Sequence, residues 1–320
     1  MTSISENKKK LISLVTPCYN EAENIALFYS VTKEIRDSLS DRYDFEHIVC
    51  DNASTDGSFN LLLALSRSDP SFKLIQNSRN FGILANAYNG LLSASGDAVL
   101  IFLPVDMQDP PSLIPKFIQK WEEGYQVVYG MRSQREESIL MQASRRIFYK
   151  LLSAISNVDY PAYAGDFQLV DKVVIDEIKK TYNADPFVRM HTFYCGFRSF
   201  GYNYVWKKRS GGKSKNSFLN MIAQGLEGIT SFSIFPLRLV SLIGLFCAFI
   251  SCLVIVLTLI GVLFGVLPPG QQGILTIIIG LFSLGSVNLL ALGVIGEYIA
   301  RILNQVRGKS NVIERRRVNF

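Results

Sequence analysis

Histidine and paired cysteine are scarce in this sequence of 320 residues. There are two histidines, His47 and His191, and no Gly-x-Ser-x-Gly segment, so a hydrolase built on a Ser–His–Asp triad is poorly supported. The five cysteines include no Cys-x-x-Cys pair, and two of them lie in a long apolar run. This scattered set is typical of reduced thiols at apolar positions, and it indicates that the main domain faces a cytosol.

Charge is absent from one long stretch of the chain. The 58 residues 239–296 contain no Asp, Glu, Lys or Arg, which excludes a purely soluble protein. Because about 20 residues span a bilayer, we expect two spans, at about 239–266 and 274–295, separated at the Pro-Pro-Gly of residues 268–270. Basic residues flank the stretch and the connecting loop carries no charge, so the positive-inside rule predicts a hairpin with both flanks in the cytoplasm.

The positive net charge of +6 is concentrated beside this stretch, in residues 205–238 and 297–320. Basic flanks of a membrane segment suit anionic lipid head groups, so we expect membrane lipids and not nucleic acid as partners. Within residues 216–235, apolar side chains recur at helical spacing with polar ones opposite. This pattern predicts an amphipathic helix that lies in the membrane interface or packs on the main domain.

Residues 11 to about 131 alternate short apolar runs with stretches of helical spacing. The expected strands are 11–16, 45–51, 72–76, 98–103 and 126–131, and the expected helices are 21–39, 58–66, 82–95 and 112–123. Repeated strand–helix–strand units predict an α/β fold with a mainly parallel sheet covered on both faces. In such sheets ligands bind at the carboxyl ends of the strands, where the polar motifs of this sequence fall.

Two polar motifs follow the first two strands. The first is Thr16-Pro17-Cys18-Tyr19-Asn20-Glu21, and the second occupies residues 51–58. Asp51, at a strand end, can accept hydrogen bonds from a base N–H or a ribose hydroxyl, and it can equally be a turn former. For Asp56 we expect the structural role of a turn or cap residue.

A third motif, Pro104-Val105-Asp106-Met107-Gln108-Asp109-Pro110-Pro111, follows the fourth strand. Oxygen ligands two residues apart on an extended segment point the same way, which suits a Mg²⁺ or Mn²⁺ ion shared with a diphosphate. The alternative is a loop that leads into a helix at Pro110-Pro111.

These segments, in this order, resemble a known family. Further matching segments are Arg79-Asn80-Phe81-Gly82, Gly165-Asp166-Phe167, Gly212-Lys213-Ser214-Lys215 and Gly296-Glu297-Tyr298-Ile299. The chain is similar to family 2 polyprenyl-phosphate glycosyltransferases of the GT-A (Rossmann-like) fold, of the bactoprenol glucosyltransferase and dolichyl-phosphate mannose synthase type. The resemblance implies inverting transfer of a sugar, expected to be glucose from UDP-glucose, to undecaprenyl (bactoprenyl) phosphate. The product would be a lipid-linked sugar donor for surface glycan modification, such as that of lipopolysaccharide.

The resemblance also implies roles for individual residues. By this resemblance, the residues that bind the nucleotide sugar are Pro17, Tyr19, Glu21, Asp51 and Asp106, and those that bind Mg²⁺ or Mn²⁺ are Asp106 and Gln108. Asp166 is the catalytic residue, as a base or an orienting group. The acceptor phosphate is bound by Arg132, Arg209, Ser214 and Lys215. The sequence departs from the family at Pro104, which replaces the first Asp of the usual Asp-x-Asp-x-Gln, and at Asn52, where a second Asp is common. The loss of a carboxylate at Pro104 predicts altered metal affinity or donor choice.

The expected organisation is a cytoplasmic GT-A domain at 1–215, an amphipathic juxtamembrane helix at 216–235, two transmembrane helices within 236–300 and a basic cytoplasmic tail at 301–320. We expect a multi-pass protein of the inner (cytoplasmic) membrane, with homo-oligomerisation left open. Alternatives within the class are a mannosyl- or aminoarabinosyl-transferase. Outside it, the alternatives are a catalytically inactive nucleotide-sugar-binding membrane protein or a lipid flippase, although spans without ionisable residues offer little for transport.

Overall fold

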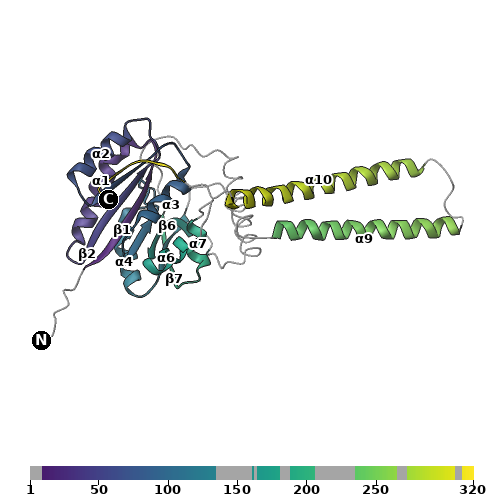
Figure 1. Cartoon of the computed structure of the whole chain (residues 1–320). Coiled ribbons are helices and arrows are strands. Elements are labelled where there is room, and N and C mark those ends of the chain that lie inside the picture. The colour runs from purple at the N-terminus through teal and green to yellow at the C-terminus, as the bar shows by residue number, and fades with distance from the viewer. Residues whose placement is uncertain are drawn as a thin grey trace. The chain divides into compact units, whose positions relative to one another are not determined.

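The computed structural model describes residues 9–134, 161, 164–180, 188–205, 235–264, 272–306 and 312–320. The chain forms two compact units (Figure 1). Residues 235–264 and 272–306 belong to one, here called the helical unit. The other described residues, including 312–320, belong to the second, here called the α/β unit.

The α/β unit is built on one sheet of eight strands. The strands are β1 (Lys10–Cys18), β2 (Tyr43–Asp51), β3 (Phe72–Asn77), β4 (Ala98–Ile101), β5 (Val127–Gln134), β6 (Ala164–Asp171), β7 (Ser199–Val205) and β8 (Glu314–Val318), in the order β7-β5-β6-β4-β1-β2-β3-β8. The sheet is parallel from β4 to β3, whereas β6 and β8 run antiparallel to their neighbours. The predicted α/β fold is confirmed, with its parallel region at the centre and antiparallel strands toward each end.

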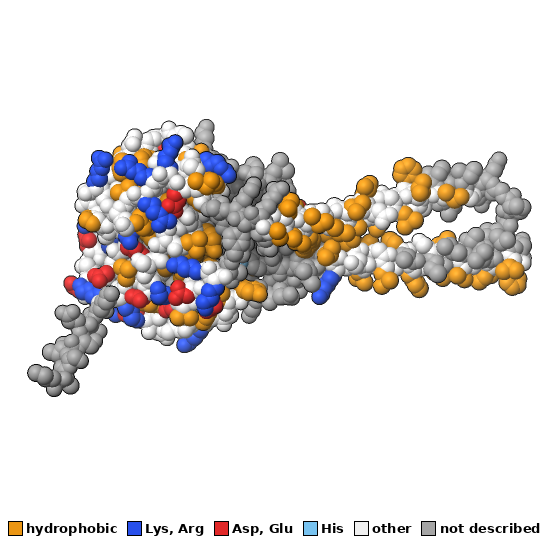
Figure 2. Space-filling model, viewed as in Figure 1, with side chains coloured by type: hydrophobic (Ala, Val, Ile, Leu, Met, Phe, Trp, Pro, Cys, Tyr) orange, Lys and Arg blue, Asp and Glu red, His pale blue; other side chains and the backbone are white. Residues whose placement is uncertain are grey.

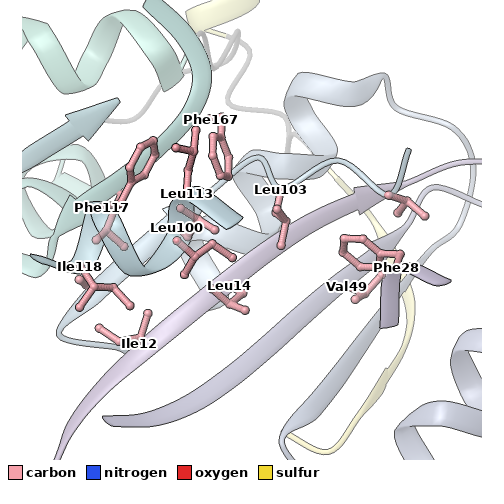
Figure 3. Packing of buried hydrophobic residues seen from close by; sticks show 14 of the residues in the cluster. Ile12, Leu14, Phe28, Val49, Leu100, Leu103, Leu113, Phe117, Ile118 and Phe167 are labelled. Carbon is pink, nitrogen blue, oxygen red and sulfur yellow. The ribbon is translucent and has the colours of Figure 1, made fainter. Parts of the chain in front are cut away.

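Helices cover both faces of this sheet (Figure 1). They are α1 (Ala22–Ser38), α2 (Ser58–Ser68), α3 (Ile83–Ser93), the 3₁₀ turn η1 (Pro111–Leu113), α4 (Ile114–Glu122), α6 (Lys172–Lys180) and α7 (Val188–Tyr194). Figure 3 shows the core on one face, where Ile12 and Leu14 of β1 pack with side chains of α1 and α4. On the opposite face α3 lies so close to the sheet that a Cβ on Gly90 would stand 2.6 Å from Val15 Cγ1. Successive side chains of a strand point to opposite faces of the sheet, so apolar side chains along the buried strands form a core on each face.

Strand β8 lies within residues 301–320, which the sequence predicts only as a basic tail. Residues 301–306 continue a helix of the helical unit, and Glu314–Val318 pair antiparallel with β3. Asn89 Nδ2 donates to Glu314 Oε1 at 2.7 Å, and Asn319 Nδ2 donates to the Phe72 carbonyl at 3.0 Å. The basic composition hid this strand, because an edge strand whose side chains face solvent tolerates consecutive charges.

The helical unit consists of two long apolar helices, α9 (Phe235–Leu263) and α10 (Gln272–Val306), that pack against each other (Figure 1). Large apolar side chains along both are exposed, whereas charged side chains gather on the α/β unit (Figure 2). Within the described residues, one stretch, Gly280–Ala300, is long and apolar enough to cross a membrane. The other predicted span, at about 239–266, stays a prediction.

Candidate active site

The carboxyl ends of the central strands bring the predicted site residues to one edge of the sheet. Cys18 of β1 pairs with Asp51 of β2, and β4 lies on the other side of β1. Strand β6 runs the opposite way and pairs Gln168 with Ile101, so its early residue Asp166 lies beside the end of β4. Along this edge, in sheet order, stand Asp51 (β2), Pro17 (β1), Asp106 (after β4), Asp166 (β6) and Arg132 (β5).

The loops after β1 and β2 are tied to each other. The Asn20 backbone N–H donates to Ser54 Oγ and the Glu21 N–H donates to Ser58 Oγ, both at 2.9 Å. Asp51 is buried beneath them and accepts the Ser54 N–H at 3.3 Å. Burial raises the pKa of the Asp51 carboxyl above its ordinary value, against the opposing effect of the Ser54 hydrogen bonds. The loops therefore form a fixed frame around one buried acid.

Asp56 has the structural role predicted for it. Its carboxylate accepts hydrogen bonds from the Ser58 N–H at 3.0 Å, from Ser58 Oγ at 2.6 Å and from the Ala22 N–H at 3.1 Å. These bonds satisfy backbone donors at the starts of α1 and α2.

The buried Asn52 is the centre of a network of amide groups. Its Nδ2 donates to Asn80 Oδ1 at 2.9 Å and to the Gly82 carbonyl at 3.2 Å. Its Oδ1 accepts from Asn77 Nδ2 and from the Phe81 N–H, each at 3.0 Å. An ionised aspartate has no donor, so the two bonds to the 80–82 loop require the amide. This explains why Asn stands where the family often has Asp.

The loop after β4 carries the predicted metal ligands. Asp106 is 5% exposed, and its Oδ1 accepts the Gln108 backbone N–H at 3.2 Å. No group of three or more His, Cys, Asp and Glu side chains that could hold a metal occurs in the described part of the chain. Pro104 contributes a turn, through its carbonyl and the Met107 N–H, and no carboxylate. One carboxylate and one amide suit Mg²⁺ or Mn²⁺ completed by substrate oxygens, and do not suit an all-protein metal cage.

Asp166 faces an arginine that the sequence did not single out. Arg189 Nε of α7 lies 3.5 Å from Asp166 Oδ1. The two side chains share a small, mainly apolar pocket whose walls come from α3, the end of β4 and α7, including Leu84, Phe102 and Val188. An arginine held against the carboxylate restricts its orientation. No spacing in the sequence links positions 166 and 189, because the contact joins a strand to a helix beyond an intervening segment.

Arg132 of β5 is also held by an acid. Its guanidinium forms an ion pair with Asp109, at 2.9 Å between Nη2 and Oδ2. Burial opposes the charged form of Arg132, but Asp109 and Tyr204 outweigh burial and keep the pKa of the guanidinium above its ordinary value. Burial and the Asp109 charge raise the pKa of the Tyr204 phenol. The other residues predicted to bind the acceptor phosphate lie outside the described residues, and so does the segment 216–234. These residues are Arg209, Ser214 and Lys215.

Comparison with known proteins identifies relatives over nearly the whole chain. Residues 13–179 match glycosyl transferase family 2. The chain is 36% identical over 303 residues to the SfII prophage-derived bactoprenol glucosyl transferase of Shigella flexneri, covering 94% of this chain and 96% of that protein. It is 36% identical over 298 residues to the uncharacterized glycosyltransferase YkcC of Bacillus subtilis (strain 168), covering 93% and 91%.

Among solved structures, a mannosyltransferase from Pyrobaculum calidifontis in complex with GDP-Man and Mn²⁺ aligns at a TM-score of 0.42 and 18% identity, over 64% of this chain and 59% of that one. The sequence relatives are more similar, at 36% identity. Because the family match spans residues 13–179 and the relatives match more than nine-tenths of the chain, this protein belongs to glycosyl transferase family 2 and is a glycosyltransferase.

Proposed function

We propose that the protein transfers glucose, with inversion, from UDP-glucose to the phosphate of a membrane polyprenol such as undecaprenyl phosphate. The observation that carries the proposal is the order of side chains along the sheet edge, from the buried Asp51 through Asp106 and Asp166 to Arg132. Along this edge the nucleoside end of a nucleotide sugar, its sugar end and an anionic acceptor would bind one after another. A relative named bactoprenol glucosyl transferase supports the sugar and the lipid.

On the donor side, Pro17, Tyr19, Glu21 and Asp51 would hold the nucleoside, and Asp106 would lie beside the diphosphate. Asp106 and Gln108 would hold Mg²⁺ or Mn²⁺, which supplies Lewis-acid stabilisation of the departing diphosphate. Because Pro104 supplies no carboxylate, substrate oxygens would have to complete the coordination of the ion. We therefore expect metal binding to be weak until the nucleotide sugar is present.

On the acceptor side, the chemistry needs little proton transfer. The second pKa of a phosphate monoester is about 6, so the lipid phosphate is largely a dianion near neutral pH. A phosphate oxygen attacks the anomeric carbon, the bond from that carbon to the β-phosphate oxygen breaks, and UDP leaves with the bonding electrons. Arg132 would offset the repulsion between the two anions. Asp166, oriented by Arg189, would accept the proton that a monoanionic acceptor still carries.

The membrane arrangement belongs to the same proposal. We propose that α9 and α10 both cross the inner membrane, with residues 216–235 at its cytoplasmic surface. The described residues before α9 and those after α10 both belong to the α/β unit, so a chain that crosses must also return. A polyprenyl phosphate presents its head group at the membrane surface, where such an enzyme would have to open.

Product analysis tests the proposal. Detergent-purified protein is incubated with undecaprenyl phosphate, Mg²⁺ or Mn²⁺ and a panel of UDP- and GDP-sugars, and the lipid is analysed by mass spectrometry. One hexose added from UDP-glucose is the expected result. Product from a GDP-mannose or aminoarabinose donor would replace the sugar assignment, and nucleotide binding without product from any donor would contradict the catalytic role.

A further inference from the structure

Three side chains, from the loop after β4, from β5 and from β7, form a hydrogen-bonded cluster at the proposed acceptor end of the site. Tyr204 Oη donates to Asp109 Oδ1. Arg132 Nε donates to the same Asp109 oxygen and to Tyr204 Oη, both at 3.2 Å, and Arg132 Nη2 donates to the second Asp109 oxygen at 2.9 Å. Asp109 therefore binds the guanidinium in a two-point fork, and the phenol closes the third side. We call these three residues the arginine clasp.

The clasp joins three separate parts of the fold. Asp109 follows Gln108 directly, in the loop after β4, whereas Arg132 lies on β5 and Tyr204 on the edge strand β7. Tyr204 reaches across β5 because position 130 is glycine: a Cβ there would stand 2.6 Å from the Tyr204 ring. Gly130 thus leaves room on the sheet for the Tyr204 ring.

Exposure differs sharply within the clasp. The Arg132 side chain is 20% exposed, whereas that of Asp109 is 2% exposed. The acid therefore lies deeper than the arginine and fixes the plane of its guanidinium, while the Arg132 side chain keeps access to solvent. A pre-oriented arginine loses little conformational freedom when it meets an anion.

We propose that Asp109 and Tyr204 are positioning residues that hold the Arg132 guanidinium toward the acceptor phosphate. The proposal rests on the function proposed above. Since Asp109 shares a loop with Asp106 and Gln108, the clasp also fixes the distance between the donor-side loop and the acceptor-side arginine. A loosened clasp should weaken acceptor use while leaving nucleotide-sugar binding intact.

Two variants loosen the clasp in different ways. Tyr204→Phe keeps the ring and removes the hydroxyl, and Gly130→Ala keeps all three polar groups and displaces the ring. For each we expect the KM for undecaprenyl phosphate to rise about tenfold, the effect of one hydrogen bond to a charged group, with the KM for UDP-glucose changed less than about twofold. The matched control is Tyr202→Phe, two residues away on β7, whose ring stacks on Phe117; its two KM values should equal those of the wild type.

The outcomes are separable. Wild-type turnover with an unchanged KM for undecaprenyl phosphate in both variants would overturn the positioning role of the clasp. A parallel rise of both KM values, or a loss of the folded state shown by thermal unfolding, would also overturn it, because either result indicates a purely structural role. Absence of any lipid product from the wild-type protein would instead contradict the proposed function. UDP binding, measured by calorimetry on the same samples, checks the donor side independently of turnover.

Discussion

At the residue scale, the loop after β4 concentrates two tasks in four positions. Asp106 and Gln108 are the proposed metal ligands, and Asp109 forms an ion pair with Arg132. The segment between them is turned and not extended: the Pro104 carbonyl accepts the Met107 N–H, and Met107 has a φ of 51°. One short loop thus contains both the proposed metal ligands and the carboxylate that holds Arg132.

Asp106→Asn should lower metal-dependent turnover by at least about a hundredfold, because the variant keeps the shape of the side chain and loses its charge. The measurement is the initial rate against Mn²⁺ concentration, with thermal unfolding to verify folding. Asp44→Asn, at an exposed position of β2, is the control and should behave as wild type. Wild-type rates in Asp106→Asn would remove the metal assignment.

Asn52→Asp should destabilise the protein although the two side chains are nearly equal in size. The variant loses both donated bonds to the 80–82 loop and places a carboxylate against the Asn80 and Gly82 oxygens. We expect a loss of about 2 kcal/mol in unfolding free energy, because position 52 is buried and the carboxylate there would face two oxygens without a hydrogen bond to either. Asn60→Asp on the exposed side of α2 is the control in chemical denaturation, and equal stability of the two variants would contradict the network.

At the element scale, helix α3 shows how packing overrides helix propensity. Gly90→Ala in an exposed helix would stabilise it by up to about 1 kcal/mol. Here a Cβ would stand 2.6 Å from Val15 Cγ1 and 2.9 Å from Cys50 Sγ, so we expect destabilisation by about 1–3 kcal/mol. Thermal unfolding compares it with Leu92→Ala, at an exposed position of α3, which should change little. A stabilised Gly90→Ala protein would show that α3 is free to shift.

The elements differ in how far sequence reveals them. Strands β1 to β5 were predictable, because each is a short apolar run bounded by turn residues. Strand β8 was missed, since Arg315, Arg316 and Arg317 carry no apolar signal and its pairing with β3 depends on a partner far away in the chain. The site divides in the same way. Asp51 and Asp106 follow strand ends and could be found, whereas Arg189 and Tyr204 acquire their roles only through contacts between distant segments.

At the scale of the whole molecule, membrane topology is open to a direct test. Single cysteines at Gln271→Cys, between α9 and α10, and at Arg315→Cys, on β8, are treated with a membrane-impermeant maleimide. In intact spheroplasts we expect labelling at 271 alone, and labelling at 315 only after permeabilisation, because two crossings return the chain to the side of the α/β unit. The wild-type protein measures background from native cysteines. Labelling of both positions from outside would contradict the hairpin.

The position of β8 also sets an order of events during synthesis. The ribosome makes β1 to β7 first, then both apolar helices, and only afterwards the strand that covers β3. Until then the β3 edge offers unpaired backbone groups, which are a template for association with other chains. Completion of the sheet therefore waits for translation of both apolar helices, and a chain truncated within either of them is left with an open edge that proteases and chaperones can detect.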